Sequence, residues 1–369
     1  MRSFVAISLL TASVLASPIE ERQAARGQFT FYPIPTPLSG ICDLAEGHDK
    51  AIWFEDILVN RIGRLDPNTG VVTDYPIPFT TPLSNVTLGP IPGPAQQILD
   101  RTAFSCAIRP GADGYLYATN GVRNQLVQIN ETTKEIKVFG PVDPTGNLFP
   151  FNDLYTADNG LYLTQTTGNT FEFFSFKDHT FTTYHVPTPL ALPLGVYVAT
   201  DKKVYIPELV GNKILIFNPA DKSIVEVPLP APLQGPAVTR AQVGDWVYFS
   251  LFEGDGTGRI NIKSHKVELY HTNQIGGLGG VTANPTRAGN VPGTFFTANV
   301  ISLLNSRTLK FSYIPFPDTF AEFIPGGGIL ADVPPYLDIS AQYRPEDNSI
   351  YFGSILRNAV GKYKLASGE

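Results

Sequence analysis

Short apolar segments alternate with polar turns along nearly the whole chain, and one unit recurs. The unit contains an extended segment ending in an aromatic residue and proline, a Pro/Gly loop, an apolar strand, a polar turn and an aromatic strand. Short runs of this kind, bounded by Gly, Pro, Asn and Asp, are typical of β-strands. The aromatic strands are predicted at seven places: 51–54, 115–117, 161–163, 204–206, 246–249, 294–296 and 350–352.

A third strand follows each aromatic strand, and a polar turn then leads to a fourth. The third strands open at Asn60, Asn124, Asn169, Asn212, Gly258, Asn299 and Asn358. A four-stranded sheet cannot bury both of its faces alone, so repeated sheets of this kind stack in a ring. The pattern therefore predicts an all-β fold, a single seven-bladed β-propeller over residues 27–369.

The sequences at the two ends of the chain indicate that they pair with each other and close the ring. Residues 28–33 look like a fourth strand without the first three, and we expect them to pair with residues 361–364 of the last blade. This pairing would leave no open sheet edge. A row of independent β-sandwiches is the alternative, but it would not need this extra strand.

The first residues indicate passage through the secretory pathway. A positive start, an apolar run and a small-residue cleavage pattern predict a signal peptide at 1–16, followed by a short linker or propeptide at 17–26. Sequons at Asn85 and Asn130 are candidate glycosylation sites. We therefore expect a secreted glycoprotein.

Composition and charge limit the classes of partner that the protein is expected to bind. The 369 residues are 43% apolar and 16% charged, which argues against disorder. A net charge of -6 provides no basic face for nucleic acid. No later apolar run reaches the roughly 18 residues expected of a membrane span. A hydrophobic small molecule is the expected partner.

The two cysteines occupy equivalent positions in the first two units. Cys42 precedes Trp53 by eleven residues, and Cys106 precedes Tyr117 by eleven. This register places them on the innermost strands of neighbouring blades, and in an oxidising compartment it predicts a Cys42–Cys106 disulfide near the channel mouth. A thiol nucleophile is the alternative, but it would need a base, and no histidine holds a comparable inner position.

Segments 32–37 (YPIPTP), 51–55 (AIWFE) and 60–64 (NRIGR) resemble the blade repeat of the streptogramin B lyases, also called virginiamycin B lyases. The match is close in the first blade and looser in the other six. The resemblance implies a seven-bladed propeller and a magnesium-assisted elimination that uses His and Glu near the channel. In that family the inner segments often begin His-Gly-Ile. The equivalent segments here contain no histidine: 39–41, 104–106, 151–153, 194–196 and 339–341.

Histidine is the side chain best suited to acid/base catalysis at neutral pH. All five are instead expected at solvated surface positions: His48, His179, His185, His265 and His271. No Cys/His metal spacing, Gly-x-Ser-x-Gly motif or phosphate-cradling loop is present. We therefore expect no cofactor and assign no metal ligand. A divalent cation held by channel oxygens, as in lactonase-type six-bladed propellers, remains the alternative.

The candidate site is the channel mouth at which fourth strands cross to the next blade. Two long crossings, 79–104 and 316–338, are predicted to form a lid there. The candidate catalytic residues are Glu55, Asn152, Glu208 and Tyr336. The candidate substrate-binding residues are Asp56, Arg101, Phe104, Asn120, Phe151, Gln165, Glu253 and Asp338. Asp153 is a further polar group at this mouth.

Three functions fit these features. The signal peptide and the two cysteines resemble the build of fungal hetero-Diels-Alderases of tropolonic sesquiterpenoid biosynthesis, which implies orientation and desolvation of a substrate for cycloaddition. We place this secondary-metabolite enzyme first, with Glu55 or Glu208 assisting a preceding dehydration. The alternatives are a streptogramin B lyase-like or lactonase-like C–O lyase or hydrolase and a non-catalytic secreted propeller that binds a ligand.

Overall fold

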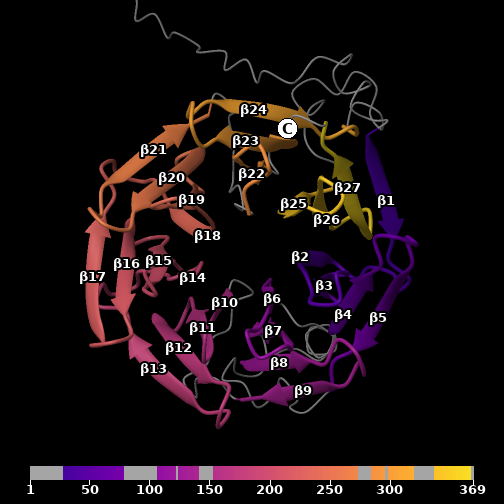
Figure 1. Cartoon of the computed structure of the whole chain (residues 1–369), viewed down its shortest axis with the longest axis horizontal. Helices are drawn as coiled ribbons and strands as arrows, with labels where there is room; N and C mark the ends of the chain where they lie inside the picture. The colour runs from indigo at the N-terminus through magenta and orange to yellow at the C-terminus, as the bar shows by residue number, and fades with distance from the viewer. Residues whose placement is uncertain are drawn as a thin grey trace, which may run out of the picture.

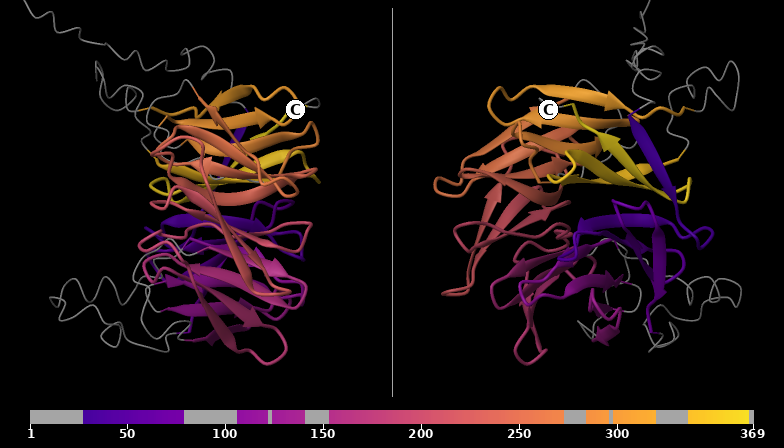
Figure 2. Two further views of the ribbon diagram at one scale, coloured as in Figure 1. Left: turned by 90° about the vertical axis from the view of Figure 1, so that its left-hand side faces the viewer. Right: turned by 45° about the vertical axis from the view of Figure 1, so that its right-hand side comes forward.

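The structure is a computed structural model that describes residues 28–78, 106–121, 124–140, 153–272, 284–295, 298–319 and 336–366. The predicted signal peptide, the linker, the Asn85 sequon and most of both long crossings lie outside these residues. In the described part, strands form antiparallel sheets arranged in a ring (Figure 1). Seven such blades make a β-propeller, as the repeats predict, and Figure 2 shows the ring from two further sides.

The first three blades follow the chain in order from the innermost strand outward. The first contains β2 (Ile41–Glu46), β3 (Ile52–Asp56), β4 (Arg61–Leu65) and β5 (Val72–Pro76). The second contains β6 (Ile108–Pro110), β7 (Leu116–Asn120), β8 (Gln125–Ile129) and β9 (Ile136–Phe139). The third contains β10 (Leu154–Ala157), β11 (Gly160–Gln165), β12 (Thr170–Ser175) and β13 (Phe181–His185).

The remaining blades repeat this order. The fourth contains β14 (Tyr197–Val198), β15 (Val204–Glu208), β16 (Lys213–Asn218) and β17 (Ser223–Pro228). The fifth contains β18 (Pro236–Val243), β19 (Trp246–Leu251), β20 (Gly256–Asn261) and β21 (Val267–His271). The sixth shows β22 (Asn290–Phe295), β23 (Val300–Asn305) and β24 (Phe311–Pro315) among the described residues. The seventh contains β25 (Asp338–Arg344), β26 (Ser349–Ser354), β27 (Ala359–Lys364) and the N-terminal β1 (Phe29–Pro33).

The seventh blade closes the ring with both ends of the chain. β1 pairs with β27 in an antiparallel register that runs from Phe29 opposite Tyr363 to Pro33 opposite Ala359. β1 and β27 lie side by side at the edge of the ring (Figure 1). The predicted closure is confirmed, and it covers the outer edge of β27 with a strand from the other end of the chain.

The asparagine before each third strand explains part of the repeat. Asn60, Asn124, Asn169, Asn212, Asn299 and Asn358 all have a positive φ between 52° and 58°, a conformation that asparagine tolerates better than most residues. The Asn358 side chain also donates to the carbonyls of Ile34 and Thr36 and accepts from the backbone of Ser39. Asn358 thus fixes the crossing from the last blade to the first.

Glycine on the third strand is another repeated position, and the aromatic side chain on the second strand explains it. A Cβ placed on Gly63 would lie 2.0 Å from Phe54, and one on Gly258 would lie 2.2 Å from Phe249. Glycine is therefore required for the ring of one strand to lie flat across its neighbour. These rings belong to the apolar clusters between blades that form the core.

The fifth blade differs from its prediction at one boundary. Its third strand begins at Gly256, two residues before the predicted start, because Asp255 takes the positive-φ position that asparagine holds elsewhere. None of the described segments forms a helix long and apolar enough to cross a membrane.

Candidate functional site

A disulfide joins the innermost strands of the first two blades. Cys42 on β2 bonds to Cys106, which is separated from the start of β6 by Ala107 alone. The Cα atoms of the two cysteines are 5.3 Å apart. The pairing predicted from the shared register is confirmed. It fixes two strands that line the channel next to the charged residues described below.

A buried ionic cluster lies in the channel beside this disulfide. Asp43 on β2 is fully buried and accepts from Arg109 Nη1 at 2.7 Å. Arg240 on β18 donates to both oxygens of the same carboxylate, at 2.6 and 3.0 Å. Asp153 lies 3.7 Å from Arg109 Nη2 and 3.5 Å from Arg240 Nη2. The cluster therefore links the inner regions of the first, second, third and fifth blades.

The two aspartates of the cluster differ in their electrostatics. Burial alone would raise the pKa of Asp43, but Arg109 and Arg240 offset it and hold that pKa below its usual value. Burial raises the pKa of Asp153 and prevails over the same two arginines, aided by the nearby Asp43 carboxylate. Asp43 is therefore the resident anion of the cluster, and Asp153 is the group more easily protonated.

Glu55, a predicted catalytic residue, extends this cluster toward the mouth at which fourth strands cross to the next blade, here called the crossing mouth. It lies on β3 with 1% of its surface exposed, and its Oε2 accepts from the Ala107 N–H at 2.6 Å. Among the described residues, its buried Oε1 has no hydrogen-bond partner. Burial and the Asp43 carboxylate raise the pKa of Glu55 well above the usual value, although Ala107 and Arg109 oppose them. The surroundings of Glu55 thus favour the protonated form of its carboxyl group.

Three other predicted acidic residues lie where blades meet. Burial, opposed by Ser39, raises the pKa of Asp56 to about 7. Burial and the Glu226 carboxylate raise that of Glu208 to about 8. Burial, opposed by Ser354 and Arg357, raises that of Asp338 to about 7. The pKa of each carboxyl group is shifted by a different set of neighbouring residues. The described contacts therefore do not bring the three groups together.

The remaining described candidates have separate surroundings. Asn120 donates to Asn60 Oδ1 at 3.1 Å and Gln165 to Asn124 Oδ1 at 3.3 Å, so both side chains reach the preceding blade. The Tyr336 ring stacks on the guanidinium of Arg357 at 3.8 Å. Glu253 is exposed. The other four candidates lie outside the described residues: Arg101, Phe104, Phe151 and Asn152.

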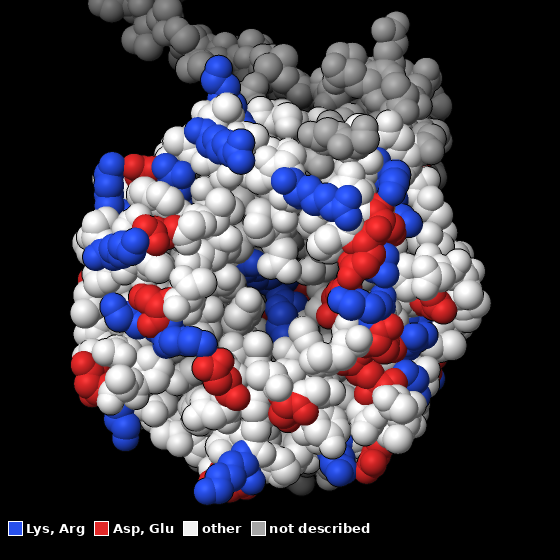
Figure 3. All heavy atoms as spheres, viewed as in Figure 1, with Lys and Arg blue, Asp and Glu red and all other residues white. Residues whose placement is uncertain are grey.

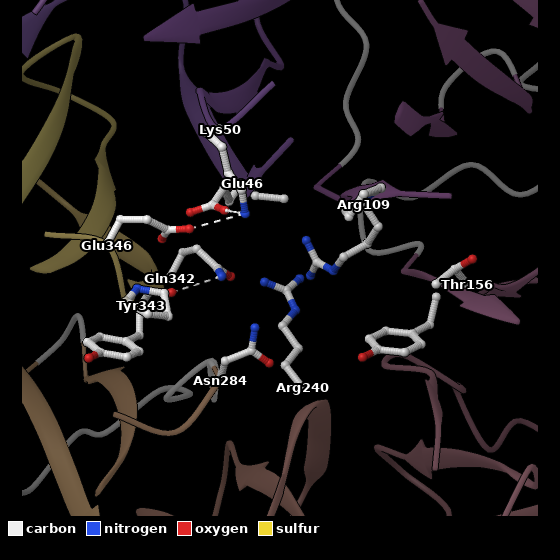
Figure 4. A pocket seen from close by; sticks show the side chains of 13 residues that line it. Glu46, Lys50, Arg109, Thr156, Arg240, Asn284, Gln342, Tyr343 and Glu346 are labelled. Carbon is white, nitrogen blue, oxygen red and sulfur yellow. Dashed lines mark hydrogen bonds and ion pairs between the residues drawn. The ribbon is translucent and has the colours of Figure 1, made fainter. Parts of the chain in front are cut away.

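A pocket of about 340 Å³ opens at the other end of the channel, among the turns that join inner to second strands, here called the hairpin mouth. Ala45, Glu46, Pro110 and Thr156 are among its lining residues, and Arg109 and Arg240 also line it. In Figure 4 the two guanidinium groups lie near each other in the middle of the pocket. Figure 3 shows Lys or Arg side chains within the hollow at the centre of the ring.

Sequence reasoning did not find Asp43, Arg109 or Arg240 as site residues. Each is a charged residue flanked mainly by apolar residues on an inner strand: Ile41-Cys42-Asp43-Leu44 on β2 is an example. A charge at such a position needs a partner, because burying it alone is costly. This was the signal available from the sequence, although it does not identify the partner.

The histidines occupy peripheral positions, as expected. His48, His179, His185 and His271 are exposed, and His265 is half-buried between β20 and β21. His185 and His271 stand opposite the first residues of β12 and β20, in the same register that Pro76 holds opposite β4. His48 contacts Glu131 at 2.7 Å.

The lyase resemblance implies a magnesium site among the channel residues. Within the described ranges, no group of three or more His, Cys, Asp or Glu side chains is placed to hold an ion. Asp43 and Asp153 face guanidinium groups instead. The described residues therefore do not fit a magnesium site.

The fold and the channel define the class as a seven-bladed β-propeller with a buried ionic cluster. Neither a family model nor a curated protein matches the sequence. Among solved structures, virginiamycin B lyase from Staphylococcus aureus is similar with a TM-score of 0.74 and 18% identity over 92% of this chain and 99% of that one.

A second streptogramin B lyase structure gives a TM-score of 0.74 and 17% identity, covering 92% of this chain and 97% of that one. Hydrazine synthase from Kuenenia stuttgartiensis gives 0.64 and 14%, covering 90% of this chain and 97% of that one. At these identities the similarities establish the fold alone.

Proposed function

We propose that the protein is a secreted enzyme that cleaves a C–O bond of a small organic molecule by elimination. The observation that carries this proposal is the Glu55 carboxyl group, which is buried, has a raised pKa and keeps one oxygen without a partner among the residues that the structure describes. A buried carboxyl group with a raised pKa is a suitable proton donor to a leaving oxygen. The similarity to streptogramin B lyases supports the same reaction class.

The proposed step is a dehydration in which Glu55 acts first as acid and then as base. The Glu55 proton passes to the hydroxyl oxygen that leaves as water, and the C–O bond breaks. The Glu55 carboxylate then takes a proton from the adjacent carbon, whose electron pair forms the new C=C bond. Glu55 returns to its neutral form, and substrate becomes alkene and water with all atoms accounted for.

The neighbours of Glu55 suit this exchange. Arg109 lowers the pKa of Glu55, so it stabilises the carboxylate that forms during the step. The Ala107 N–H, at 2.6 Å from Oε2, holds the carboxyl group in place and leaves Oε1 to the substrate. Asp43 acts in the opposite direction and favours the return of the proton. The pKa of Glu55 is thus balanced by identifiable groups.

A hetero-Diels-Alder cyclisation is the second candidate, and the same carboxyl group favours it. A neutral carboxyl donates a hydrogen bond to a carbonyl and so polarises it without consuming a proton. Dehydration would supply the reactive unsaturated partner, and cycloaddition would follow in the same site. A non-catalytic, ligand-binding propeller is the remaining alternative.

The test is turnover of a defined panel by the purified protein. The panel contains small β-hydroxy carbonyl compounds, alone and paired with an electron-rich alkene, and quinupristin, which one solved virginiamycin B lyase structure contains. Products are measured by mass, with and without chelator. Loss of one water from a single compound indicates dehydration, and the sum of two compounds less one water indicates cycloaddition.

Glu55→Gln supplies the mechanistic comparison, and Glu135→Gln is the matched control because Glu135 is exposed in an outer turn. We expect Glu55→Gln to lower the rate by about 100-fold or more and Glu135→Gln to leave it unchanged. Equal rates in the wild type and Glu55→Gln would refute the assigned role. Loss with chelator that magnesium restores would favour the metal-assisted alternative. Binding without turnover of any compound would favour the non-catalytic one.

A further inference from the structure

The pocket at the hairpin mouth is a second feature of the channel, separate from the unpartnered oxygen of Glu55. Arg109 comes from β6 of the second blade and Arg240 from β18 of the fifth, and both are 7% exposed. They share one fully hydrogen-bonded carboxylate, that of Asp43. Two like charges are thus held close together beside Asp43, and Asp153 is a more distant acidic neighbour.

Both guanidinium groups retain donors without an acceptor in the described part of the chain. Arg109 Nη2 and Arg240 Nε are buried and have no hydrogen-bond partner there. Asp153, their other acidic neighbour, lies beyond hydrogen-bond distance, at 3.7 and 3.5 Å from the nearest guanidinium nitrogens. Burial also raises the pKa of Asp153, which reduces the negative charge it offers them. A buried charged donor without an acceptor is costly, so these atoms favour an acceptor from outside the chain.

The acidic residues at the rim do not provide that acceptor, because they are engaged with cations. Glu46 contacts Lys50 at 2.7 Å and Arg344 at 3.2 Å, and Glu346 contacts Lys50 at 3.1 Å. In Figure 4 Lys50 lies beside Glu46 and is joined to Glu346 by a dashed line. The centre of the pocket therefore presents guanidinium groups, while the carboxylates stay at its edge.

The rest of the lining suits an organic ligand. Tyr155 provides an aromatic surface, and Asn284 and Gln342 provide amide groups, which lie to the left of the arginines in Figure 4. A volume of about 340 Å³ falls at the lower end of the range for small-molecule sites. The lining has room for an organic body as well as an anionic group.

We propose that the pocket at the hairpin mouth binds a small organic carboxylate, whose oxygens accept hydrogen bonds from Arg109 and Arg240. Planar guanidinium groups match the geometry of a carboxylate. The site would recognise an anionic ligand at the end of the channel opposite to the crossing mouth. This proposal does not depend on the elimination reaction at Glu55.

The test is isothermal titration of the purified full chain with benzoate and with benzamide. Benzamide has nearly the same shape but no charge, so it is the matched ligand control. We expect benzoate to bind at one site per chain and benzamide to bind at least about 10-fold more weakly. Inorganic phosphate, titrated at the same ionic strength, distinguishes an organic carboxylate site from a phosphate site. Binding of phosphate but not benzoate would overturn the proposal, as would equal binding of benzoate and benzamide.

Two variants examine the pocket without removing the charge beside Asp43. Arg240→Lys keeps the cation but removes the planar fork, and we expect it to weaken benzoate binding by about 10-fold or more. Gln342→Trp fills the pocket from β25 without touching the ionic cluster, and we expect it to abolish binding. Lys222→Gln, in an exposed turn, is the control and should bind as the wild type does. Undiminished binding in both pocket variants would contradict the proposed location.

Discussion

Arg240 donates two hydrogen bonds to the carboxylate of Asp43, which lies 197 residues earlier in the chain. The two residues belong to inner strands of the fifth and first blades, so the bonds cross the channel. This pair, together with the Cys42–Cys106 disulfide, ties inner strands that are not neighbours in sequence. The channel centre is therefore a fixed polar structure.

Removing the shared anion should destabilise the fold strongly. Asp43→Asn leaves Arg109 and Arg240 facing each other without their carboxylate, and we expect the free energy of unfolding to fall by about 3 to 5 kcal/mol. Chemical denaturation measures it. Asp158→Asn is the control, because Asp158 pairs with Lys202 on an exposed surface and should cost less than about 1 kcal/mol. Equal small losses in both variants would show that the cluster is not structurally important.

The disulfide should contribute independently of the ionic cluster. Replacing both Cys42 and Cys106 by alanine removes a link between residues 64 apart in sequence, and we expect a loss of about 2 to 4 kcal/mol. The denaturation midpoint of the wild type should fall similarly in reductant, whereas that of the double variant should not change. A reductant effect of the same size in both proteins would contradict this assignment.

Asn358 should matter for ring closure beyond its own blade. Its side chain bonds Ile34, Thr36 and Ser39 in the crossing that leads from β1 to β2. We expect Asn358→Ala to cost about 2 to 4 kcal/mol, as several hydrogen bonds are lost together. Asn68→Ala, in an exposed turn, should be nearly neutral. Amide exchange of β1 should increase in the first variant, and unchanged protection there would argue against the closure role.

Glu208 should make stability depend on pH. Its pKa is about 8 in the folded protein against an ordinary value of 4.5, so the folded state binds the proton more tightly than the unfolded state. The resulting contribution is complete below about pH 4.5 and is lost as pH rises toward 8. Glu208→Gln should therefore unfold like the wild type at pH 4.5 but be more stable at pH 8, by at least about 1.4 kcal/mol.

Denaturation midpoints of both proteins at the two pH values provide this measurement. Glu135→Gln, with an exposed side chain, should follow the wild type at both. If Glu208→Gln and the wild type differ equally at pH 4.5 and pH 8, the proton is not held as described.

Local repetition was sufficient to predict the blades, the closure of β1 on β27 and the disulfide. These features depend on register, because equivalent positions in each unit occupy equivalent places in the ring. Register also predicted that His185 and His271 stand where Pro76 stands in the first blade. Asp255 escaped prediction because aspartate replaces the asparagine of the other units at that turn.

The centre of the site could not be predicted in the same way. Asp43 and Arg240 meet only because the ring brings strands of separate blades to one axis, and nothing local in the sequence indicates that pairing. Glu55 and Asp56 illustrate the second difficulty. Successive strand residues face opposite sides, so Glu55 reaches the following blade at Ala107, whereas Asp56 is influenced by Ser39 on the crossing from β1.

The most direct test of the central claim is the pH dependence of kcat/KM for whichever compound of the panel is turned over. A neutral Glu55 acid predicts a rate that persists above the usual titration range of a glutamic acid and falls as pH rises through its raised pKa. That fall should be absent from the residual activity of Glu55→Gln. A rate that rises over the same range, or a fall that persists in Glu55→Gln, would contradict the account.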